Sequence, residues 1–422
     1  MTPLERLKNH SNEFRKEVIP LAPNVYCAVG FAASNVYMIV ADQGIIIVDT
    51  TESTKAAENV FAAFREITSL PVRTIIYTHS HRDHISGARV FAGEDDPEII
   101  ASHRFSSDLV AVDSDKPLPN KALAARTKRQ FGIGLSFPDE RINLGCGPGD
   151  RPLEGLGAGF VPPTTQITEE RVKREIGGIA LELVHAPGET PDHLVVWDHE
   201  NRILICGDNY YKSFPNLYAI RGTRYRDFDA WADSLDLLLA FNADTLAPGH
   251  SRPVVGAENV RTVLTDYRDA IRHVVAETVA GLDRGEGADE LADKIGLPAS
   301  LAEKPHLQEF YGKIAWAVRA YCSGTLGWFD GNPTNLDRLS PRQEAEKIIA
   351  LAGGEAAVFD TALTAHRTGD HQWSLELLDR LLAVDSENTQ YRLLKAACLR
   401  ARADEEINAT ARNYYLVAAA EI

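Results

Sequence analysis

The stretch Thr78–His84, with the sequence THSHRDH, places three histidines and one aspartate within seven residues. It directly follows the apolar run 73–77, which is typical of a buried strand. The first two histidines are two residues apart, so on an extended segment they point to the same side. Asp83 and His84 follow at the point where the chain is expected to turn into a helix. This spacing predicts two metal ions side by side, and N and O ligands favour Zn²⁺. The four candidate ligands are His79, His81, Asp83 and His84.

Four ligands do not complete two metal sites, and three later loops offer further candidates. Each of these loops follows an apolar run, and loops at strand ends are where α/β folds place their sites. The segment 185–193 (HAPGETPDH) contains His185, Glu189 and His193, which compete for one ligand position. The other two loops contribute Asp208, in CGD, and His250, in APGH.

The arrangement of apolar runs predicts an α/β fold for the first 250 residues. Strands are expected at 36–40, 45–48 and 73–77, a helix at 53–66, and strand–helix alternation to about residue 114. The pattern returns with strands at 172–176, 179–185, 194–197, 202–206 and 245–247 and a helix at 231–241. This order suggests two similar halves that face each other.

Two further regions differ from this pattern. Residues 132–166 are rich in Gly and Pro and predict a long loop, interpreted as a flap whose Phe131, Phe137 and Phe160 line an apolar pocket. From about residue 256 the chain is expected to be nearly all helical, with helical hairpins over 355–403. A module for dimerisation or support is the interpretation that we prefer for this helical region.

Composition narrows the possible functions. The 422 residues carry 44 basic and 60 acidic side chains, a net charge of −16, which argues against a nuclease or another nucleic-acid binder. The five cysteines are scattered and form no CxxC motif, so free thiols are expected rather than a disulfide framework or zinc knuckle. No signal peptide and no apolar run of membrane-spanning length is visible, which predicts a cytoplasmic protein.

An arginine-rich segment, 214–227 (FPNLYAIRGTRYRD), lies between two of the candidate metal loops. Arginine suits planar or tetrahedral oxyanions, so one interpretation is a clamp for an anionic head group. The alternative is a surface loop whose arginines pair with Asp227 and Asp229. The residues alone do not decide between these interpretations.

The motifs HSHRDH, PGETPDH, CGDN and APGH, in that order over about residues 20–255, resemble the metallo-β-lactamase superfamily. The resemblance implies an αββα sandwich with two zinc ions that activate a bridging water for hydrolysis. Most of the superfamily has His where this chain has Glu189, which keeps His193 as a competing ligand. Carried over by position, the first site would contain His79, His81 and Glu189, the second Asp83, His84 and His250, and Asp208 would bridge both.

A closer resemblance is to the zinc-dependent alkyl sulfatases of this superfamily. It rests on PNLYAIRGTRYRD, on LGWFDGNPTNL (326–336), on LAGG (351–354) and on the Glu of the PGE turn. It implies that Asn216 and Arg221 hold the sulfate, and that 284–422 is a helical dimerisation domain through which two chains form a homodimer.

The chain also departs from that family in three respects. Members usually carry a further sterol-carrier-like domain, which is not expected in these 422 residues, and many are exported. A His after the RG pair is thought to protonate the leaving group, and Arg226 occupies that position here. Tyr218, Tyr225 or a metal-bound water could replace it.

The resulting hypothesis is a dinuclear-zinc hydrolase of sulfate esters, with a catalytic domain at 1–283 and a dimerisation domain at 284–422. A lactonase or phosphoesterase on the same metals is the closest alternative, and a non-catalytic scaffold is another. The catalytic candidates are Asp83, Asp208, Arg226 and Tyr218, and those for substrate binding are Asn216, Arg221, Arg224 and Tyr225.

Overall fold

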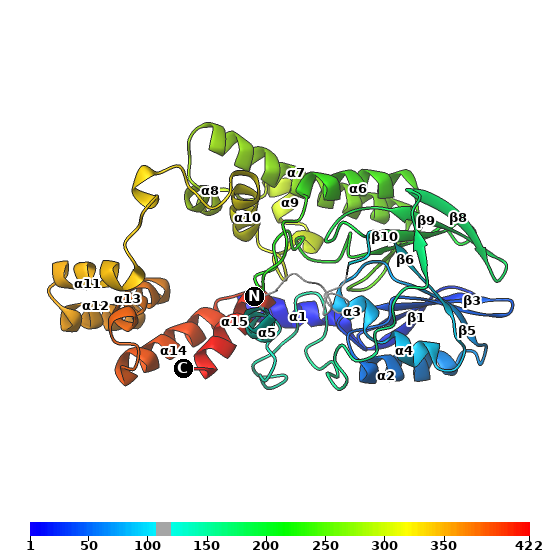
Figure 1. Cartoon of the computed structure of the whole chain (residues 1–422), viewed down its shortest axis with the longest axis horizontal. Coiled ribbons are helices and arrows are strands. Elements are labelled where there is room, and N and C mark those ends of the chain that lie inside the picture. Colours follow the sequence, from blue (N-terminus) through cyan, green and yellow to red (C-terminus); the bar gives the residue numbers. More distant parts are fainter. Residues whose placement is uncertain (107–119) are drawn as a thin grey trace.

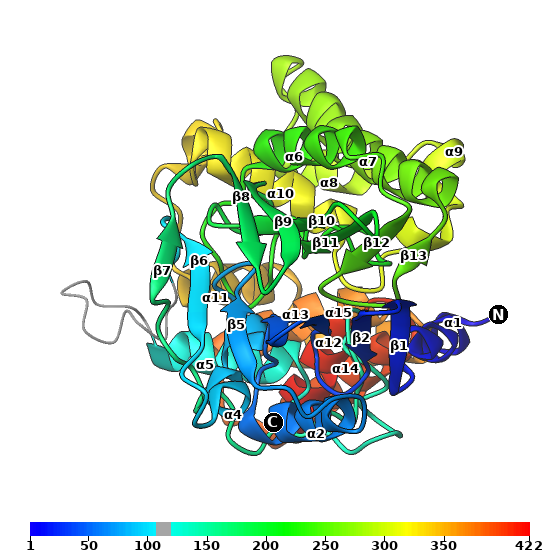
Figure 2. The same cartoon turned by 90° about the vertical axis from the view of Figure 1, so that its right-hand side faces the viewer.

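The computed structural model describes residues 1–106 and 120–422, and its centre is a pair of β-sheets that face each other (Figures 1 and 2). Helices cover the outer surface of each sheet, so the layers run helix, sheet, sheet, helix (Figure 2). This confirms the predicted α/β fold class and the αββα sandwich. The alternation predicted near residue 114 falls partly on 107–114, which lie outside the described residues.

Within the described residues, the first sheet has seven strands in chain order. Its first four strands are antiparallel and the remainder pair in parallel. Helices α2 (Thr54–Arg65) and α4 (Ala88–Ala92) cover it, and Ala57, Val60 and Phe64 of α2 face the sheet within one apolar cluster. The strands are β1 (Glu17–Ala22), β2 (Val25–Val29), β3 (Val36–Ala41), β4 (Gly44–Val48), β5 (Val72–Ile76), β6 (Glu98–Ser102) and β7 (Thr165–Ile167).

In the part of the chain that the structure describes, the second sheet has six strands in the order β13-β12-β11-β10-β9-β8. They are antiparallel except for the parallel pair β11 and β12. Helices α6 (Phe228–Ala240) and α7 (Ala257–Asp283) pack on its outer surface (Figure 2). The strands are β8 (Arg171–Ile176), β9 (Ile179–His185), β10 (Leu194–Asp198), β11 (Ile203–Gly207), β12 (Thr245–Pro248) and β13 (Val254–Val255).

The space between the sheets is filled by branched aliphatic side chains from both. Ile46 and Ile76 of the first sheet belong to the same buried cluster as Leu183, Val196 and Ile205 of the second. Each such side chain contributes on the order of 2 kcal/mol when it is fully removed from water. This shared core fixes the two sheets relative to each other, so the loops at one edge of both sheets also keep fixed relative positions.

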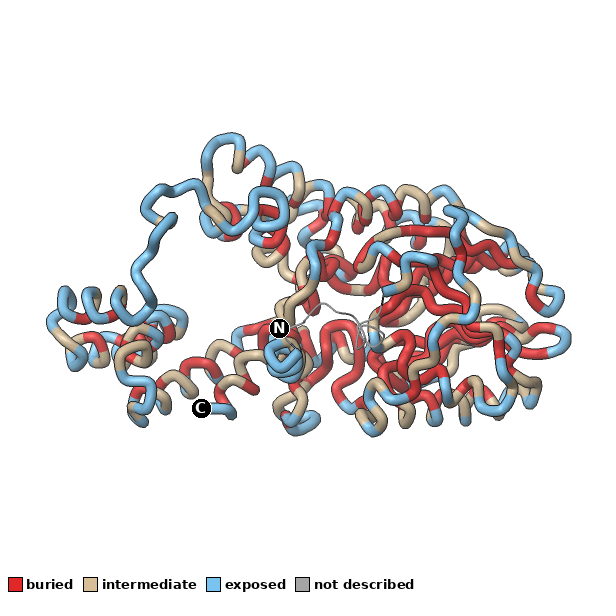
Figure 3. The backbone as a smooth tube through the Cα atoms, in the orientation of Figure 1, coloured by how far each residue is buried: buried red, intermediate tan, exposed pale blue. Residues whose placement is uncertain are grey.

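The helical part has two separate cores. Helices α8 (Ala288–Lys294), α9 (Ala299–Ala302) and α10 (Ile314–Leu326) contribute to the core that α6 and α7 form with the second sheet, although they lie beyond the predicted domain boundary at residue 283. An exposed connection, 327–340, then leads to a second cluster (Figure 3). That cluster contains α11 (Pro341–Leu351), α12 (Glu355–Arg367), α13 (His371–Val384), α14 (Thr389–Asp404) and part of α15 (Ala409–Ala420).

The predicted long loop follows α5 (Asn120–Gln130), and residues 131–164 contain neither helix nor strand. Its central part, 142–149, is buried rather than open, because Gly145 lies against the backbone of Phe310 and Gly147 against that of Ala33. Phe160 stacks near Tyr77 with ring centroids 6.3 Å apart. The loop is therefore a packed connection over this part, and the interpretation as a flap does not hold for it.

All five cysteines are buried and free, as expected from their spacing. Within the described ranges, no single helix is long and apolar enough to cross a membrane. Helices α11 and α12, taken together, have the length and the apolar composition of a membrane-spanning segment, but their axes are bent by 89° at the break between them.

Candidate metal centre

The seven predicted metal ligands meet at one edge of the two sheets. The turn after β5 carries His79 and His81 and continues into the short helix α3 (Arg82–Ile85), which carries Asp83 and His84. The loop between β9 and β10 brings Glu189, and the ends of β11 and β12 bring Asp208 and His250. Their ligand atoms form three groups within 4.8 Å: His79, His84 and Asp208; Asp83, His84 and His250; and His81, Glu189 and Asp208.

The ligand atoms on the first side of the centre are close enough to share one ion. His79 Nε2 lies 2.9 Å from His81 Nδ1 and 3.6 Å from Asp208 Oδ2. His81 Nδ1 lies 3.4 Å from Glu189 Oε2. Two imidazole nitrogens and two carboxylate oxygens thus converge, a donor set that suits a divalent metal of borderline softness.

On the second side of the centre, imidazole nitrogens and carboxylate oxygens also converge. His250 Nε2 lies 3.4 Å from Asp83 Oδ2 and 3.2 Å from Asp208 Oδ2, and His84 Nε2 lies 3.3 Å from Asp208 Oδ1. Since Asp208 contacts histidines on both sides, its carboxylate has the position of a bridge between two ions.

Unsatisfied polar atoms show that a cation fits this centre. His84 Nε2 and Asp208 Oδ1 are buried and form no hydrogen bond with any described residue, although they face each other. Buried polar atoms without partners are costly, and a metal ion between them would satisfy both.

Two of the turns need glycine beside the ligand residue, because a side chain there would collide with other side chains of the centre. A Cβ on Gly249 would lie 2.3 Å from Asp208 Oδ1 and 2.9 Å from His84 Cε1. Gly207 has φ +48°, and a Cβ there would lie 2.6 Å from the His193 ring. The glycines of the CGD and APGH motifs therefore make room for the ligands beside them.

Carboxylates and histidines lie close together in this centre and shift each other's pKa values. Burial alone raises the pKa of Asp208, but His250, His84 and His79 hold it well below its usual range. Burial lowers the pKa of His250, but Asp208 and Asp83 raise it to about 9. Burial, together with the charge of His84, holds the pKa of His79 well below its usual value. A proton on His250 thus supplies some of the positive charge that metal ions would bring to the centre.

Sequence reasoning missed the groups that orient these ligands. Asp49 accepts a hydrogen bond from His84 Nδ1 at 2.7 Å and from the Thr78 hydroxyl and backbone N–H, each at 2.8 Å. His250 Nδ1 lies 2.7 Å from the Ala33 carbonyl oxygen, to which it donates. Such partners set the tautomer and direction of a metal-binding imidazole. The signal for Asp49 was present, since it directly follows the apolar strand 44–48.

Glu189 is positioned by two buried side chains. Its Oε1 accepts a hydrogen bond from the Tyr211 hydroxyl at 2.9 Å and pairs with Arg226 Nη1 at 2.9 Å, which leaves Oε2 directed at His81. His193 instead stacks on His79 at a centroid distance of 4.8 Å, and its Nε2 accepts the backbone N–H of Asp208 at 3.0 Å. This arrangement favours Glu189 over His193 as the ligand.

His185, the third candidate from that loop, lies elsewhere. Its Nε2 is 3.3 Å from the Ile167 carbonyl oxygen, and its ring contacts His103. It therefore packs at the end of β7, among residues that stabilise the sheet edge.

Comparisons with known proteins agree with this geometry. Residues 29–250 match the family model of the metallo-beta-lactamase superfamily, and residues 287–422 match that of alkyl sulfatase dimerisation. Over 394 residues the chain is 38% identical to a linear primary-alkylsulfatase of Pseudomonas sp., which covers 91% of this chain and 73% of the relative. The chain belongs to the alkylsulfatases of the metallo-β-lactamase superfamily.

Two further relatives extend the similarity to nearly the whole chain. An alkyl/aryl-sulfatase of Saccharomyces cerevisiae is 32% identical over 95% of this chain, which spans 63% of that relative's length. The solved structure of the stereoselective inverting sec-alkylsulfatase Pisa1 from Pseudomonas sp. superposes with a TM-score of 0.91 at 26% identity. That superposition covers 99% of this chain and 67% of Pisa1. The resemblance inferred from the motifs is confirmed.

Within this alkylsulfatase fold, the arginine-rich segment divides into an inward and an outward part. Arg226 is buried, and burial alone would lower its pKa, but the carboxylate of Glu189 raises it above the usual value. Arg226 stands at the position where relatives of this family are expected to have a histidine, and a guanidinium that keeps its proton this firmly is a poor proton donor. Its role is to hold Glu189 and the backbone carbonyl of Asn216.

The four residues expected to bind substrate differ in burial and in their contacts. Asn216 is buried, and its backbone N–H donates to Tyr211 at 2.7 Å. Arg221 is half-buried, and its charge contributes to the lowered pKa of His81, after burial and Arg226. Arg224 is exposed, and Tyr225 stacks on Phe228 and packs against Gly324 of α10. Asn216 and Arg221 are thus buried or half-buried, whereas Arg224 and Tyr225 are exposed.

Proposed function

We propose that this chain hydrolyses alkyl sulfate esters at a centre of two zinc ions held by His79, His81, Glu189, Asp208, Asp83, His84 and His250. The observation that carries the proposal is a set of three ligand groups in the fold of an alkylsulfatase. The groups are linked by His84 and Asp208, each of which belongs to two of them. Bound there, such ions lower the pKa of a water molecule and polarise an ester oxygen.

The chain's own residues supply position and charge. Asp208, held between histidines of both sides, orients the nucleophilic water and keeps the two ligand sets at a fixed spacing. Asp49 keeps His84 in the tautomer that presents Nε2 to the centre. Tyr211 and Arg226 oppose the rise that burial causes in the pKa of Glu189, and they hold its Oε1 so that Oε2 is directed at His81.

Arg221 and Asn216 are the residues that we assign to the sulfate. The backbone N–H of Arg221 donates to Gln130 Oε1 at 2.8 Å, and its Nη1 donates to the Gly222 carbonyl at 3.1 Å, so its loop is held from both sides. A guanidinium has five N–H donors, which leaves a planar fork for two sulfate oxygens. The influence of its charge on His81 supports a position beside the metal ligands.

For the proton to the leaving group we retain Tyr218 as the candidate. It lies between Asn216 and Arg221 in the chain and is half-buried, whereas Tyr225 faces α10 and Arg226 keeps its proton. A phenol can act as a general acid when it lies within hydrogen-bond reach of the leaving oxygen.

Arg221→Ala tests the sulfate assignment. Loss of one preorganised charged donor should lower kcat/KM for a medium-chain alkyl sulfate about 10²- to 10³-fold with the metal content unchanged. Arg224→Ala, three residues away and exposed, is the matched control and should leave the rate nearly unchanged. The measurement is sulfate release, run beside a phosphodiester and a lactone. Equal losses in both variants, or turnover of the lactone without any sulfate release, would contradict the proposal.

We further propose that two copies associate through the helical part. The connection after α10 exposes several large apolar side chains, and Trp328 is 78% accessible in the single chain. Large apolar side chains exposed in one segment are typical of an interaction site, and a second copy fits the match to a dimerisation family. The other members of this apolar set are Leu326, Leu336, Leu339 and Leu351.

The association has a direct test in solution. We expect a molar mass of about twice the 46.4 kDa of one chain, by light scattering, and a shift to the single-chain mass when Trp328→Asp and Leu336→Asp are combined. Leu156→Asp, at an exposed leucine of the catalytic half, should leave the mass unchanged. A single-chain mass for the unaltered protein would contradict the proposal.

A further inference from the structure

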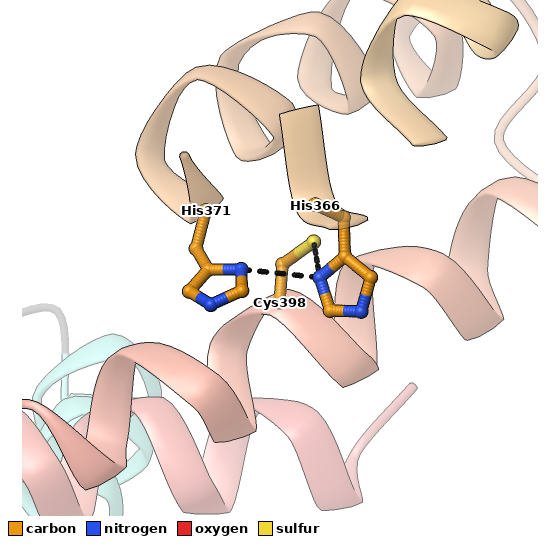
Figure 4. A group of neighbouring side chains, drawn as sticks. All are labelled: His366, His371 and Cys398. Atoms are coloured by element: carbon orange, nitrogen blue, oxygen red, sulfur yellow. Dashed lines mark hydrogen bonds between the residues drawn. The ribbon is translucent and has the colours of Figure 1, made fainter. Parts of the chain in front are cut away.

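A second group of metal-ligand side chains lies in the helical part, at the opposite end of the molecule from the sheets (Figures 1 and 4). His366 is in the last turn of α12, His371 is the first residue of α13, and Cys398 is in the middle of α14. One ligand atom from each lies within 4.8 Å of the others. Three helices thus direct two imidazoles and a thiol at one point.

The turn between α12 and α13 creates this convergence. Gly369 has φ +87°, which reverses the chain within three residues, and Asp370 caps α13 through the backbone N–H of Trp373. The two rings consequently face each other, with centroids 5.0 Å apart. Cys398 is completely buried beneath them, so the group opens to solvent only on the histidine side.

The distances fit a small tetrahedral ion. His366 Nδ1 lies 3.1 Å from His371 Nδ1 and 3.3 Å from Cys398 Sγ. Zinc bonds of ~2.0–2.1 Å to nitrogen and ~2.3 Å to sulfur place tetrahedral ligand atoms roughly 3.3 to 3.6 Å apart. The two pairs that include His366 Nδ1 are therefore slightly closer than they would be around an ion, and small side-chain rotations would open the space.

Hydrogen bonds alone serve this group poorly. The Cys398 thiol donates to the Ser374 hydroxyl at 3.2 Å, which in turn donates to the Ala362 carbonyl at 2.9 Å. The sulfur and His371 Nδ1 also both lie within hydrogen-bond distance of His366 Nδ1, which has either one N–H or one lone pair in the ring plane. This nitrogen can form a full hydrogen bond with only one of them, whereas one cation would bind all three atoms.

We propose that His366, His371 and Cys398 form a zinc site that ties the α12–α13 hairpin to α14. Binding exchanges the thiol proton, which is released to solvent, for a zinc–sulfur bond, and both imidazoles bind as neutral ligands. A water molecule from the open side completes the fourth position. Since all three residues belong to the helical module and not to the sheets, this site is separate from the candidate metal centre between the sheets.

The test uses the whole protein, dialysed against zinc and then against metal-free buffer. Cys398→Ser and His371→Gln should each contain one zinc less per chain than the unaltered protein, by elemental analysis. Cys322→Ser, at a buried cysteine in another core, is the matched control and should lose none. His371 is half-buried at a helix start, so its replacement tests the site even if Cys398→Ser impairs folding.

Cobalt(II) supplies a signal specific to sulfur ligation. The cobalt-loaded protein should show a thiolate-to-cobalt absorption band, which is retained in Cys322→Ser and in Asp208→Asn and lost in Cys398→Ser. Sulfate release should be the same in Cys398→Ser as in the unaltered protein. Equal zinc contents in all variants, or a band that persists in Cys398→Ser, would overturn the proposal.

Discussion

Exchange of Asp208 for asparagine should lower kcat/KM for an alkyl sulfate by on the order of 10³-fold or more. The carboxylate lies within 3.6 Å of His79, His84 and His250, and asparagine keeps its shape but removes the charge that bridges both ligand sets. Two-metal centres supply several kcal/mol of charge stabilisation, and each 1.36 kcal/mol is about tenfold in rate. The metal content should fall at the same time, which elemental analysis and sulfate release together would measure.

Asp198 offers a matched control for that substitution. It is also a buried aspartate at a strand end, but it accepts hydrogen bonds from the backbone of Glu200 and Asn201 in the turn after β10. Asp198→Asn should therefore cost some stability and leave the metal content unchanged. If Asp208→Asn kept full metal content and full rate, Asp208 would not be a bridge and the dinuclear assignment would fail.

Arg226→Met should be the most destabilising single change in the substrate segment, with a loss of roughly 3 kcal/mol or more in the metal-free protein. Arg226 and Glu189 are both buried, with Nη1 and Oε1 2.9 Å apart, and removal of one partner leaves a buried charge uncompensated. Burial already raises the pKa of Glu189, so without the guanidinium this carboxyl would take up a proton or turn toward solvent. Denaturant unfolding in the presence of a chelator measures the effect.

The double variant Glu189→Gln with Arg226→Met separates the ion pair from simple loss of packing. When both charges are removed, most of the lost stability should return, because a buried pair replaced by neutral groups is often nearly neutral in free energy. The activity should stay low in the double variant, since Glu189 is also a proposed metal ligand. Stability that stays as low as in Arg226→Met alone would show that the guanidinium stabilises through other contacts.

Much of the fold was predictable because its signals are local. The β-branched runs at 36–40 and 45–48 form β3 and β4, and the amphipathic segment 53–66 forms α2. The candidate metal ligands follow apolar strands directly, so the rule that sites gather at strand ends was enough to assemble them. The order of motifs along the chain, compared with the family, then supplied the fold class, which the two facing sheets confirm.

The roles of individual side chains were less predictable where they depend on distant contacts. Arg226 was a catalytic candidate because of its place after the RG pair, and its pairing with Glu189, 37 positions earlier in the chain, was not visible in the sequence. Tyr225 belongs to the same arginine-rich segment but packs on α10, about a hundred residues later. The flap interpretation failed at 142–149 for the same reason, because Phe310 and Ala33 bury that stretch.

Local pattern was thus sufficient for the α/β class and for the set of ligand types, because strand period and ligand spacing depend on neighbours in sequence. The sandwich and the family followed from the resemblance of the motifs, in their order, to a known superfamily. Three-dimensional packing decided between Glu189 and His193. Both residues lie in one short loop, but His193 points beneath His79 and accepts the Asp208 N–H, while Tyr211 and Arg226 turn Glu189 toward His81. The group His366, His371 and Cys398 exists only in the folded chain, because helix packing brings α14 beneath a turn 27 residues away.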